Sequence, residues 1–262
     1  MGAMHTKLVR GEFILKESQS MGLNSSCGSL MQGVLMREID YAYGETLHRS
    51  ELKPYSQYLI CSSSEIKWIL QTLTEEAENE IWTKTGVADW DEIYLEQKGL
   101  HLAVEGIERT CISEDDLLKK TFFGNCSRRI KIRFVTPTAF RTAGEYQNYP
   151  TARHIFQSLA NKFDAMSTDV TIGSTQVLED IQQHTKVIGY SLRSTLYSVE
   201  GIKIPSFQGT MTFSLTGPQQ LVNLTHMLLQ FGAYAGVGIK TAMGMGGMQI
   251  VERVSASERK RM

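Results

Sequence analysis

The sequence is poor in several features that would each indicate a class of protein. Of its 262 residues only five are proline and four are cysteine. Twenty-two glycines with so few prolines exclude a collagen-like chain. The cysteines form no CxxC pair and no zinc-like spacing. The longest nearly apolar stretch, HMLLQFGAYAGVG, is too short to span a bilayer, and the N-terminus has no apolar signal core. We therefore expect a cytoplasmic protein with free thiols, no membrane segment, no cofactor and no bound metal.

Charge is nearly balanced over the whole chain, but it is unevenly distributed along it. Residues 1–128 hold 13 basic and 20 acidic side chains, a net charge of −7, whereas residues 129–262 hold 14 and 8, a net of +6. A basic segment can neutralise several phosphates, although an ordinary solvated basic face explains the charge equally well. The candidates for phosphate contact are Arg128, Arg129, Lys131, Arg141 and Arg153.

The second half shows the order β-α-β-β-α-β. Alternation of Ile130, Ile132 and Phe134 predicts a strand that Pro137 ends. The same alternation puts Arg129 and Lys131 on the polar face and leaves the side of Arg133 open. The further predicted elements are helices at 149–166 and 173–184, strands at 187–199 and 204–215 joined by the turn EGIK, a helix at 216–232 with Thr216 as its cap, and a strand at 245–254.

The first half shows a similar order with weaker signals. The predicted elements are strands at 6–15, 56–62, 65–73 and 91–97, a serine-capped helix at 25–39, a helix at 74–86 capped by Thr74 and ended by Gly86, and an additional strand and short helix within 100–125. The pattern predicts an α+β protein with two tandem ferredoxin-like (βαββαβ) domains, residues 1–128 and 129–262.

A glycine-rich segment, GAYAGVGIKTAMGMGG at 232–247, lies between a predicted helix and a predicted strand. Glycine permits positive φ and lets backbone N–H groups approach an anion, and Lys240 adds a positive charge. The candidate contacts are Gly236, Gly238, Lys240, Gly244 and Gly246. The spacing of a Walker loop is absent, and a loop that follows a helix does not fit a Rossmann fingerprint. The alternative is a glycine turn that packs closely on a sheet.

Several segments, in order, resemble a known family. GVGIKTAMGMGG is similar to the C-terminal glycine-rich signature of CRISPR-associated endoribonuclease family six, a member of the RAMP superfamily. KIRFVTPTAFRTAGEYQNYPTARHIFQSL, GYSLRSTLYSVEGIKIPSFQGTMTFSLTG and TLHRSELKPYSQYLI resemble other parts of that family. The resemblance implies tandem ferredoxin-like domains and metal-independent cutting of CRISPR precursor RNA within each repeat. It also implies CRISPR repeat RNA as the partner.

Metal-free RNA cleavage uses the substrate's own 2′-hydroxyl as the nucleophile, so the enzyme must move protons and stabilise an anionic phosphorus. His48 lies in a predicted loop between the first helix and the second strand. It matches the family's catalytic histidine in the LH…KPY stretch, and we assign it the role of acid or base. Lys53, five residues later, is the candidate for stabilising the phosphate. Some family members add a tyrosine on the first helix; here Tyr41 and Tyr43 lie just past that predicted helix, and the sequence does not choose between them.

Two other functions compete with the nuclease. One is a non-catalytic RAMP subunit that holds guide RNA in a CRISPR effector complex, and the His48–Lys53 pair favours the enzyme over it. The other is a nucleotide-dependent ferredoxin-like enzyme, which would need metal carboxylates beside a phosphate loop, and no such set is evident. The remaining histidines have no catalytic context. The sequence leaves open whether the protein is a monomer or a homodimer.

Overall fold

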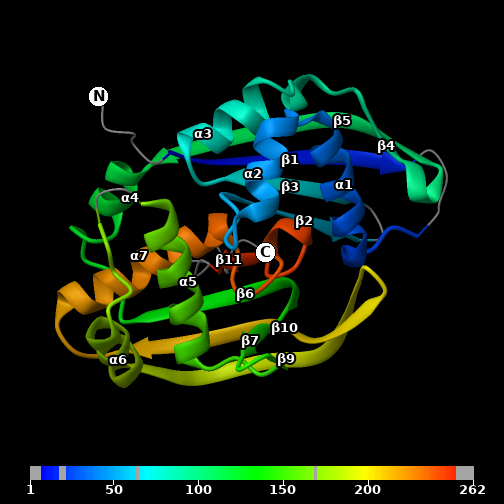
Figure 1. Cartoon of the computed structure of the whole chain (residues 1–262). Coiled ribbons are helices and arrows are strands. Elements are labelled where there is room, and N and C mark those ends of the chain that lie inside the picture. The colour runs from blue at the N-terminus through cyan, green and yellow to red at the C-terminus, as the bar shows by residue number, and fades with distance from the viewer. Residues whose placement is uncertain (1–6, 18–21, 63–64, 168–169, 252–262) are drawn as a thin grey trace, which may run out of the picture.

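The computed structural model describes residues 7–17, 22–62, 65–167 and 170–251. Figure 1 shows two main β-sheets, one from the first half of the chain and one from the second, with helices packed against each. Within the described residues, no helix combines the length and apolar character needed to cross a membrane.

The first sheet has five strands in the order β2-β3-β1-β5-β4, and all its neighbours are antiparallel. Its strands are β1 (Lys7–Glu17), β2 (Tyr55–Cys61), β3 (Ile66–Thr72), β4 (Glu92–Leu95) and β5 (Leu100–Ser113). The helices beside it are α1 (Gly28–Glu38), α2 (Tyr41–Arg49), α3 (Glu75–Ala77) with its π-helical extension (Glu78–Thr83), and α4 (Glu114–Lys120). The strand predicted as an addition, β5, is a central partner of β1, and the short β4 is the extra strand at the edge.

The second sheet has four strands in the order β11-β6-β10-β9, again antiparallel. Its strands are β6 (Arg129–Thr138), β9 (Thr185–Val199), β10 (Ile202–Leu215) and β11 (Met248–Ile250). Its helices are α5 (Ala152–Met166), α6 (Thr175–His184) and α7 (Gln219–Ala235). A small hairpin that the sequence did not predict, β7 (Phe140–Thr142) with β8 (Glu145–Gln147), follows β6. Both sheets have the strand order of the ferredoxin-like unit, so the predicted tandem fold is confirmed.

Several local predictions at element ends need correction. The helix after β1 begins with a short 3₁₀ turn whose cap is Asn24, not a serine; its side chain accepts from the Ser26 amide. Thr216 does not cap α7, because its hydroxyl donates to the carbonyl of His184. Pro137 is the penultimate residue of β6, so the strand ends one residue later than predicted. Thr74 caps α3 as predicted, since its hydroxyl accepts from the Ala77 amide.

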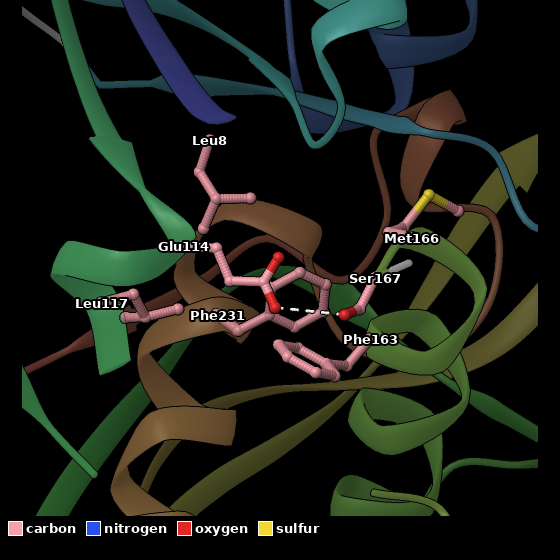
Figure 2. A pocket seen from close by; sticks show the side chains of 7 residues that line it. All are labelled: Leu8, Glu114, Leu117, Phe163, Met166, Ser167 and Phe231. Carbon is pink, nitrogen blue, oxygen red and sulfur yellow. Dashed lines mark hydrogen bonds between the residues drawn. The ribbon is translucent and has the colours of Figure 1, made fainter. Parts of the chain in front are cut away.

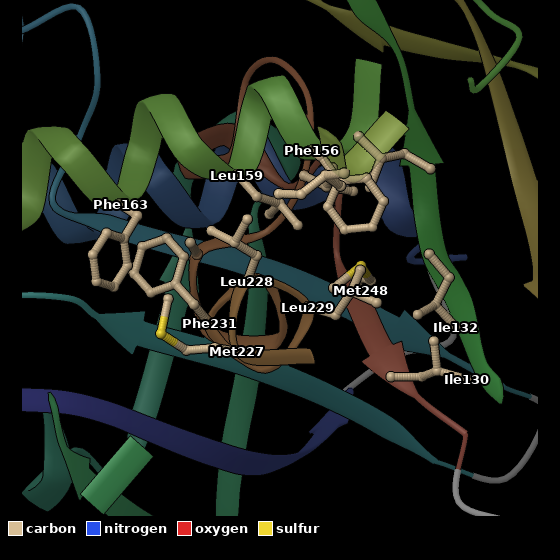
Figure 3. Packing of buried hydrophobic residues seen from close by; sticks show 14 of the residues in the cluster. Ile130, Ile132, Phe156, Leu159, Phe163, Met227, Leu228, Leu229, Phe231 and Met248 are labelled. Carbon is tan, nitrogen blue, oxygen red and sulfur yellow. The ribbon is translucent and has the colours of Figure 1, made fainter. Parts of the chain in front are cut away.

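Each sheet buries one face in an apolar core. In the second half, the inward residues of β6 and β10 meet α5 and α7, and Figure 3 shows Phe156, Leu159 and Phe163 of α5 against Leu228 and Phe231 of α7. Burying an aliphatic or aromatic side chain of this size contributes about 1.5–3 kcal/mol. The combined burial of these side chains holds α5 and α7 against the inner face of the second sheet. The outer face of this sheet is left without a covering helix in the described part of the chain.

The two halves pack against each other as well as within themselves. Leu8 of β1, Leu73 after β3 and Leu117 of α4 belong to the second core, and Ala242 of the glycine-rich segment belongs to the first. The domain boundary between residues 128 and 129 stays a prediction, because these side chains cross it in both directions.

Candidate active site and nucleic-acid surface

His48 lies in the last turn of α2, not in a loop as predicted. Asp40 caps the start of this helix by accepting from the amides of Ala42 and Tyr43. The helix buries Tyr43 and Leu47, four residues apart, and exposes His48 to solvent. The imidazole therefore stands at the surface on a rigid element, where a large substrate can reach it.

The two candidate tyrosines have opposite environments. Tyr41 is 82% exposed, and seven residues separate it from His48, so both lie on one face of α2 about 10 Å apart along the axis. Tyr43 points into the first core, where burial raises the pKa of its phenol and its buried hydroxyl oxygen has no partner among the described residues. Tyr41 is thus the tyrosine that can share a surface with His48.

Lys53 closes the end of α2. Its ammonium donates to the carbonyls of Leu47 and Ser50, and more weakly to that of His48 at 3.4 Å. A cation at a helix C-terminus satisfies carbonyls that have no partner within the helix. Partial burial lowers the pKa of this lysine. We predicted that the ammonium of Lys53 faces a phosphate. In this structure it instead binds backbone carbonyls at the end of α2, next to His48.

The loop from α2 to β2 lies where the two cores meet. Leu47 belongs to the first core, whereas Leu52 packs against the second. From there β2 runs beside the glycine-rich segment, and the side chain of Gln57 donates to the carbonyl of Ala242 at 2.9 Å. Four residues of extended chain separate Lys53 from Gln57, about 13 Å. The chain that follows His48 thus runs along the boundary between the two halves to the glycine-rich segment.

Most backbone N–H groups of the glycine-rich segment donate hydrogen bonds to acceptors within the protein. Eight of them donate to internal acceptors; they belong to residues 236, 237, 238, 239, 243, 245, 246 and 247. The glycines are needed because the chain folds tightly on itself: a Cβ on Gly238 would lie 2.3 Å from the carbonyl oxygen of Ala139, and one on Gly246 would lie 2.1 Å from that of Val237. Close packing, the alternative that the sequence left open, is therefore one function of these glycines. Their contact with RNA stays a prediction.

Two lysines hold this segment in different ways. Lys240 adopts positive φ and forms an ion pair of 3.5 Å with Glu200 at the β9–β10 turn. Lys162 of α5, which sequence reasoning missed, is only 6% exposed. Its ammonium donates to the carbonyls of Ala235 and Gly236 and to the hydroxyl of Thr241. The spacing of Lys162 from Ile155 and Leu159 places it on the buried face of α5, and this was the signal that could have identified it.

The structure separates the predicted basic residues into different surfaces. Arg129 and Lys131 are exposed on β6, and Arg133 lies on the same face, which answers the question the sequence left open. Arg128 donates to the carbonyl of Gly217. Arg141 lies on the β7–β8 hairpin and Arg153 on α5, the helix that covers the opposite face of the sheet. The five predicted phosphate contacts therefore do not form one patch.

Two cavities in the part of the chain that the structure describes are lined by residues other than His48 and Lys53. Figure 2 shows an apolar cavity of about 10 Å³ near Phe163 and Phe231, beside a hydrogen bond from Ser167 to Glu114. This volume holds at most one water. An open groove of about 380 Å³ between α1 and β4 is lined by other residues, including Arg37 and Tyr94. Of the candidate residues, His48, Arg129 and Lys131 are exposed, which suits a macromolecular substrate better than a small one, whereas Gly236, Gly244 and Gly246 are buried.

The other histidines and the cysteines do not assemble into a metal site in the part of the chain that the structure describes, because no three metal-ligating side chains gather there. The Nε2–H of His226 donates to the carbonyl of Ser127 at 2.6 Å, and burial lowers the pKa of the imidazole. His154 stacks on Phe140. His101 pairs with Glu92, and His5 lies outside the described residues.

The sequence matches a known family model and named relatives. The model described as CRISPR-associated endoribonuclease Cas6 matches residues 132–248. A Streptococcus thermophilus protein described as CRISPR-associated endoribonuclease Cas6 is 31% identical over 225 residues, which cover 84% of this chain and 90% of that protein. A Mycobacterium tuberculosis protein with the same description is 31% identical over 230 residues, 86% of this chain and 72% of that one.

The fold is also similar to solved structures. A Cas6 product complex has a TM-score of 0.79 at 20% identity, with 94% of this chain and 100% of that chain covered. A Thermus thermophilus Cas6 has a TM-score of 0.71 at 19% identity, covering 95% and 100%. A further Cas6 structure, with a TM-score of 0.74 at 20% identity over 94% and 100% of the two chains, is a variant with a histidine replaced by alanine. At these identities the likeness shows the fold.

Proposed function

Because this chain belongs to the Cas6 family of CRISPR-associated endoribonucleases, we propose that it cuts CRISPR precursor RNA within the repeats and does so without a metal ion. The observation that carries the proposal is the position of His48: it is exposed on a rigid helix at the boundary of the two halves. A protein of this fold has been solved with its product, and a histidine was the residue replaced in a variant of it.

The proposed reaction is an internal transfer. The 2′-hydroxyl oxygen attacks the adjacent phosphorus while a base takes its proton. The bond from phosphorus to the 5′-oxygen then breaks, and an acid protonates that oxygen. The products are a 2′,3′-cyclic phosphate and a 5′-hydroxyl, so atoms and charge balance without any co-reactant. An imidazole suits either proton transfer, because its ordinary pKa lies close to neutral pH.

We assign His48 the role of acid or base, and Lys53 the role of a positioning residue. The ammonium of Lys53 binds the carbonyls at the end of α2 and so fixes the turn that carries the imidazole. The exposed basic residues of β6, together with the half-buried Gly238 and Lys240 of the glycine-rich segment, supply the surface for the RNA.

The test is cleavage of a labelled repeat RNA in the presence of a metal chelator. We expect the RNA to be cut, and the same RNA with a 2′-deoxynucleotide at the cut site to stay intact. His48→Ala is expected to slow cutting about 10²- to 10⁴-fold, the usual contribution of an acid or base, with RNA affinity unchanged. His101→Ala, an exposed histidine paired with Glu92, is the matched control and should cut normally.

Three results would contradict the proposal. Cutting of the deoxy substrate would exclude the internal nucleophile, and loss of cutting in chelator would exclude metal independence. If the wild-type protein bound repeat RNA and left it intact, the non-catalytic guide-binding function would replace the nuclease.

A further inference from the structure

The outer face of α2 carries more than the proposed acid or base. Tyr41, Glu45, His48 and Arg49 follow the spacing i, i+4, i+7 and i+8, so they lie within an arc of about 100° around the helix axis. The buried residues of α2, Tyr43 and Leu47, lie on the opposite side. All four side chains of the outer face are exposed or half-buried. A substrate that reaches His48 therefore meets several polar side chains at once.

The proposed reaction needs a hydrogen-bond donor at this surface in addition to His48. When the 2′-oxygen attacks, negative charge accumulates on the non-bridging oxygens of the phosphate. Donors that are held against such a developing charge supply a large part of the rate enhancement of many enzymes. An imidazole that transfers a proton to or from a bridging oxygen does not supply this contact. A cation close to His48 is the group that would complete the site.

Two basic side chains besides His48 lie in α2 and the loop after it, residues 41–54: Arg49 and Lys53. The ammonium of Lys53 donates to the carbonyls of Leu47 and Ser50 at the end of the helix. To bind a phosphate it would have to leave these carbonyls without their donor. Arg49 is the cation of this segment that a phosphate can reach without any rearrangement of the backbone contacts.

The guanidinium of Arg49 is held only weakly by the protein. Its side chain is 81% exposed, and it forms an ion pair of 3.6 Å with Glu45, one helical turn earlier. This separation is longer than that of a hydrogen bond. Exposed pairs of this kind contribute little to stability, because both charges remain solvated. A phosphate can therefore take the guanidinium from Glu45 at a small cost.

Arg49 is also close enough to His48 to act on the same phosphate. The two residues are consecutive, so their Cα atoms lie about 3.8 Å apart, and the longer arginine side chain extends beyond the imidazole. A planar guanidinium presents paired N–H donors that match two oxygens of a phosphate. Because arginine stays protonated in proteins, it cannot replace the acid or the base. Its contribution would be electrostatic.

We propose that Arg49 is a catalytic residue that donates hydrogen bonds to the non-bridging oxygens of the phosphate at the cut site. This inference rests on the proposed function, which places the reacting phosphate at His48. It gives Arg49 the charge stabilisation that the sequence suggested for Lys53, and it leaves Lys53 as the residue that positions the end of α2. The guanidinium keeps all its protons, and none of its bonds forms or breaks during the reaction.

The first test is single-turnover cutting of repeat RNA by variants of the full-length protein at saturating protein concentration. Arg49→Gln should cut about 10²-fold more slowly, the usual effect of removing one such donor. Arg49→Lys should lie between it and the wild type, because an ammonium keeps the charge but not the paired donors. Glu45→Gln breaks the same ion pair and keeps the cation, and Lys119→Gln removes an exposed cation from the last turn of α4. Both controls should cut at the wild-type rate, and all variants should melt at the same temperature.

The second test asks whether Arg49 contacts the phosphate itself, and it measures binding rather than cutting. The probes are repeat RNAs in which one linkage at a time is a methylphosphonate, which replaces a charged non-bridging oxygen by a methyl group, with a 2′-deoxynucleotide before it. At the cut position the wild type should bind the methylphosphonate about 10-fold more weakly than the phosphate, because a charge-assisted hydrogen bond is lost. Arg49→Gln should bind these two RNAs equally well. At all other linkages the two proteins should show the same losses.

Three results would overturn the inference: wild-type cutting by Arg49→Gln, equal slowing of Glu45→Gln, or a methylphosphonate effect at the cut position that persists in Arg49→Gln. Each of these leaves the proposed function intact as long as the wild type cuts. A wild type that leaves repeat RNA intact would overturn the proposed function. In that case, a methylphosphonate effect at one linkage that depends on Arg49 would still show the contact, and the lack of such an effect would overturn the inference as well.

Discussion

At the scale of single residues, Lys162 shows how tertiary packing changes the chemistry of a side chain. A lysine in a helix is normally solvated, yet this one is 6% exposed and binds two carbonyls and a hydroxyl. Burial lowers the pKa of its ammonium to about 7. No carboxylate among the described residues pairs with it. The residue thus links α5, the end of α7 and the glycine-rich segment through one titratable group.

This pKa predicts a pH dependence of stability. An unfolded lysine has a pKa of about 10.4, so between about pH 7 and 10.4 the unfolded state binds a proton that the folded state does not. The free energy of unfolding should therefore rise with pH in this window, by up to about 1.4 kcal/mol per pH unit. Below about pH 7 both states are protonated and this contribution to the slope vanishes.

The measurement is denaturant unfolding of the wild type and Lys162→Met across that pH range. Other titrating groups cancel in the difference between the two proteins, so the difference should grow with pH above about 7 and be flat below it. Parallel curves would show that Lys162 titrates normally.

The glycine-rich segment predicts a second effect at this scale. Gly246 has a φ of +70°, and a Cβ there would meet a backbone oxygen at 2.1 Å. Gly144, in the β7–β8 turn, has a φ of +85° and open space around it. Gly144→Ala should cost only the left-handed conformation, about 1–2 kcal/mol, whereas Gly246→Ala should cost roughly 3 kcal/mol or more because the backbone must move. Thermal unfolding of the two variants checks this, and equal losses would contradict the close packing.

At the scale of elements, α2 is the critical unit, because it ends with the proposed catalytic histidine. Its start is capped by Asp40 and its end by Lys53. Amphipathic spacing buries Tyr43 and Leu47 and turns His48 outward. The cap at its C-terminus therefore governs where the imidazole stands.

Replacing Lys53 separates a positioning role from a direct one. Lys53→Gln should lower the free energy of unfolding by about 1 kcal/mol, since the helix end loses its cation. It should slow RNA cutting by less than His48→Ala does, and it should leave the shape of the pH–rate profile unchanged. If cutting fell as far as in His48→Ala while stability stayed constant, the ammonium would act on the phosphate instead.

At the scale of the whole molecule, buried hydrogen bonds join the two halves. Gln57 of β2 donates to the carbonyls of Gly28 and Ala242 and accepts from the indole N–H of Trp68. Ser56 donates to the carbonyl of Tyr234, and Gln71 to that of Ala233. Since Gln57 is fully buried, the loss of its amide would remove a hydrogen-bond partner from three polar groups.

Gln57→Leu should therefore destabilise the protein by about 2–4 kcal/mol, the cost of leaving buried polar groups unsatisfied. Because the bond to Ala242 crosses between the halves, we expect unfolding to separate into two transitions in the variant. Gln97→Leu, at an exposed position, is the control and should change stability little. Calorimetry distinguishes the outcomes, and a single unshifted transition would show that the halves do not depend on this side chain.

Much of the fold was predictable from local pattern. The alternation of Ile130, Ile132 and Phe134 identified β6, and the order of strands and helices identified the ferredoxin-like units. His48 could be identified as a catalytic candidate only from the family resemblance. A single exposed histidine does not form a repeating sequence pattern that would distinguish it. The helical state of its segment was missed because α2 is short and begins directly after α1.

The spacing of apolar residues is a local property of a few consecutive positions. The sequence alone was therefore enough to predict the strands, most of the helices and the alternation that places basic side chains on one face of β6. The partners of a polar group depend on which segments meet after folding. Only the tertiary structure therefore decided that Lys53 closes α2, that the glycine-rich amides are used internally, and that Lys162 is buried beside them. The same holds for the exposed cations of the second sheet, because hydrogen-bonded register across β6, β10 and β9, and not sequence order, brings Arg129 and Lys186 to one face.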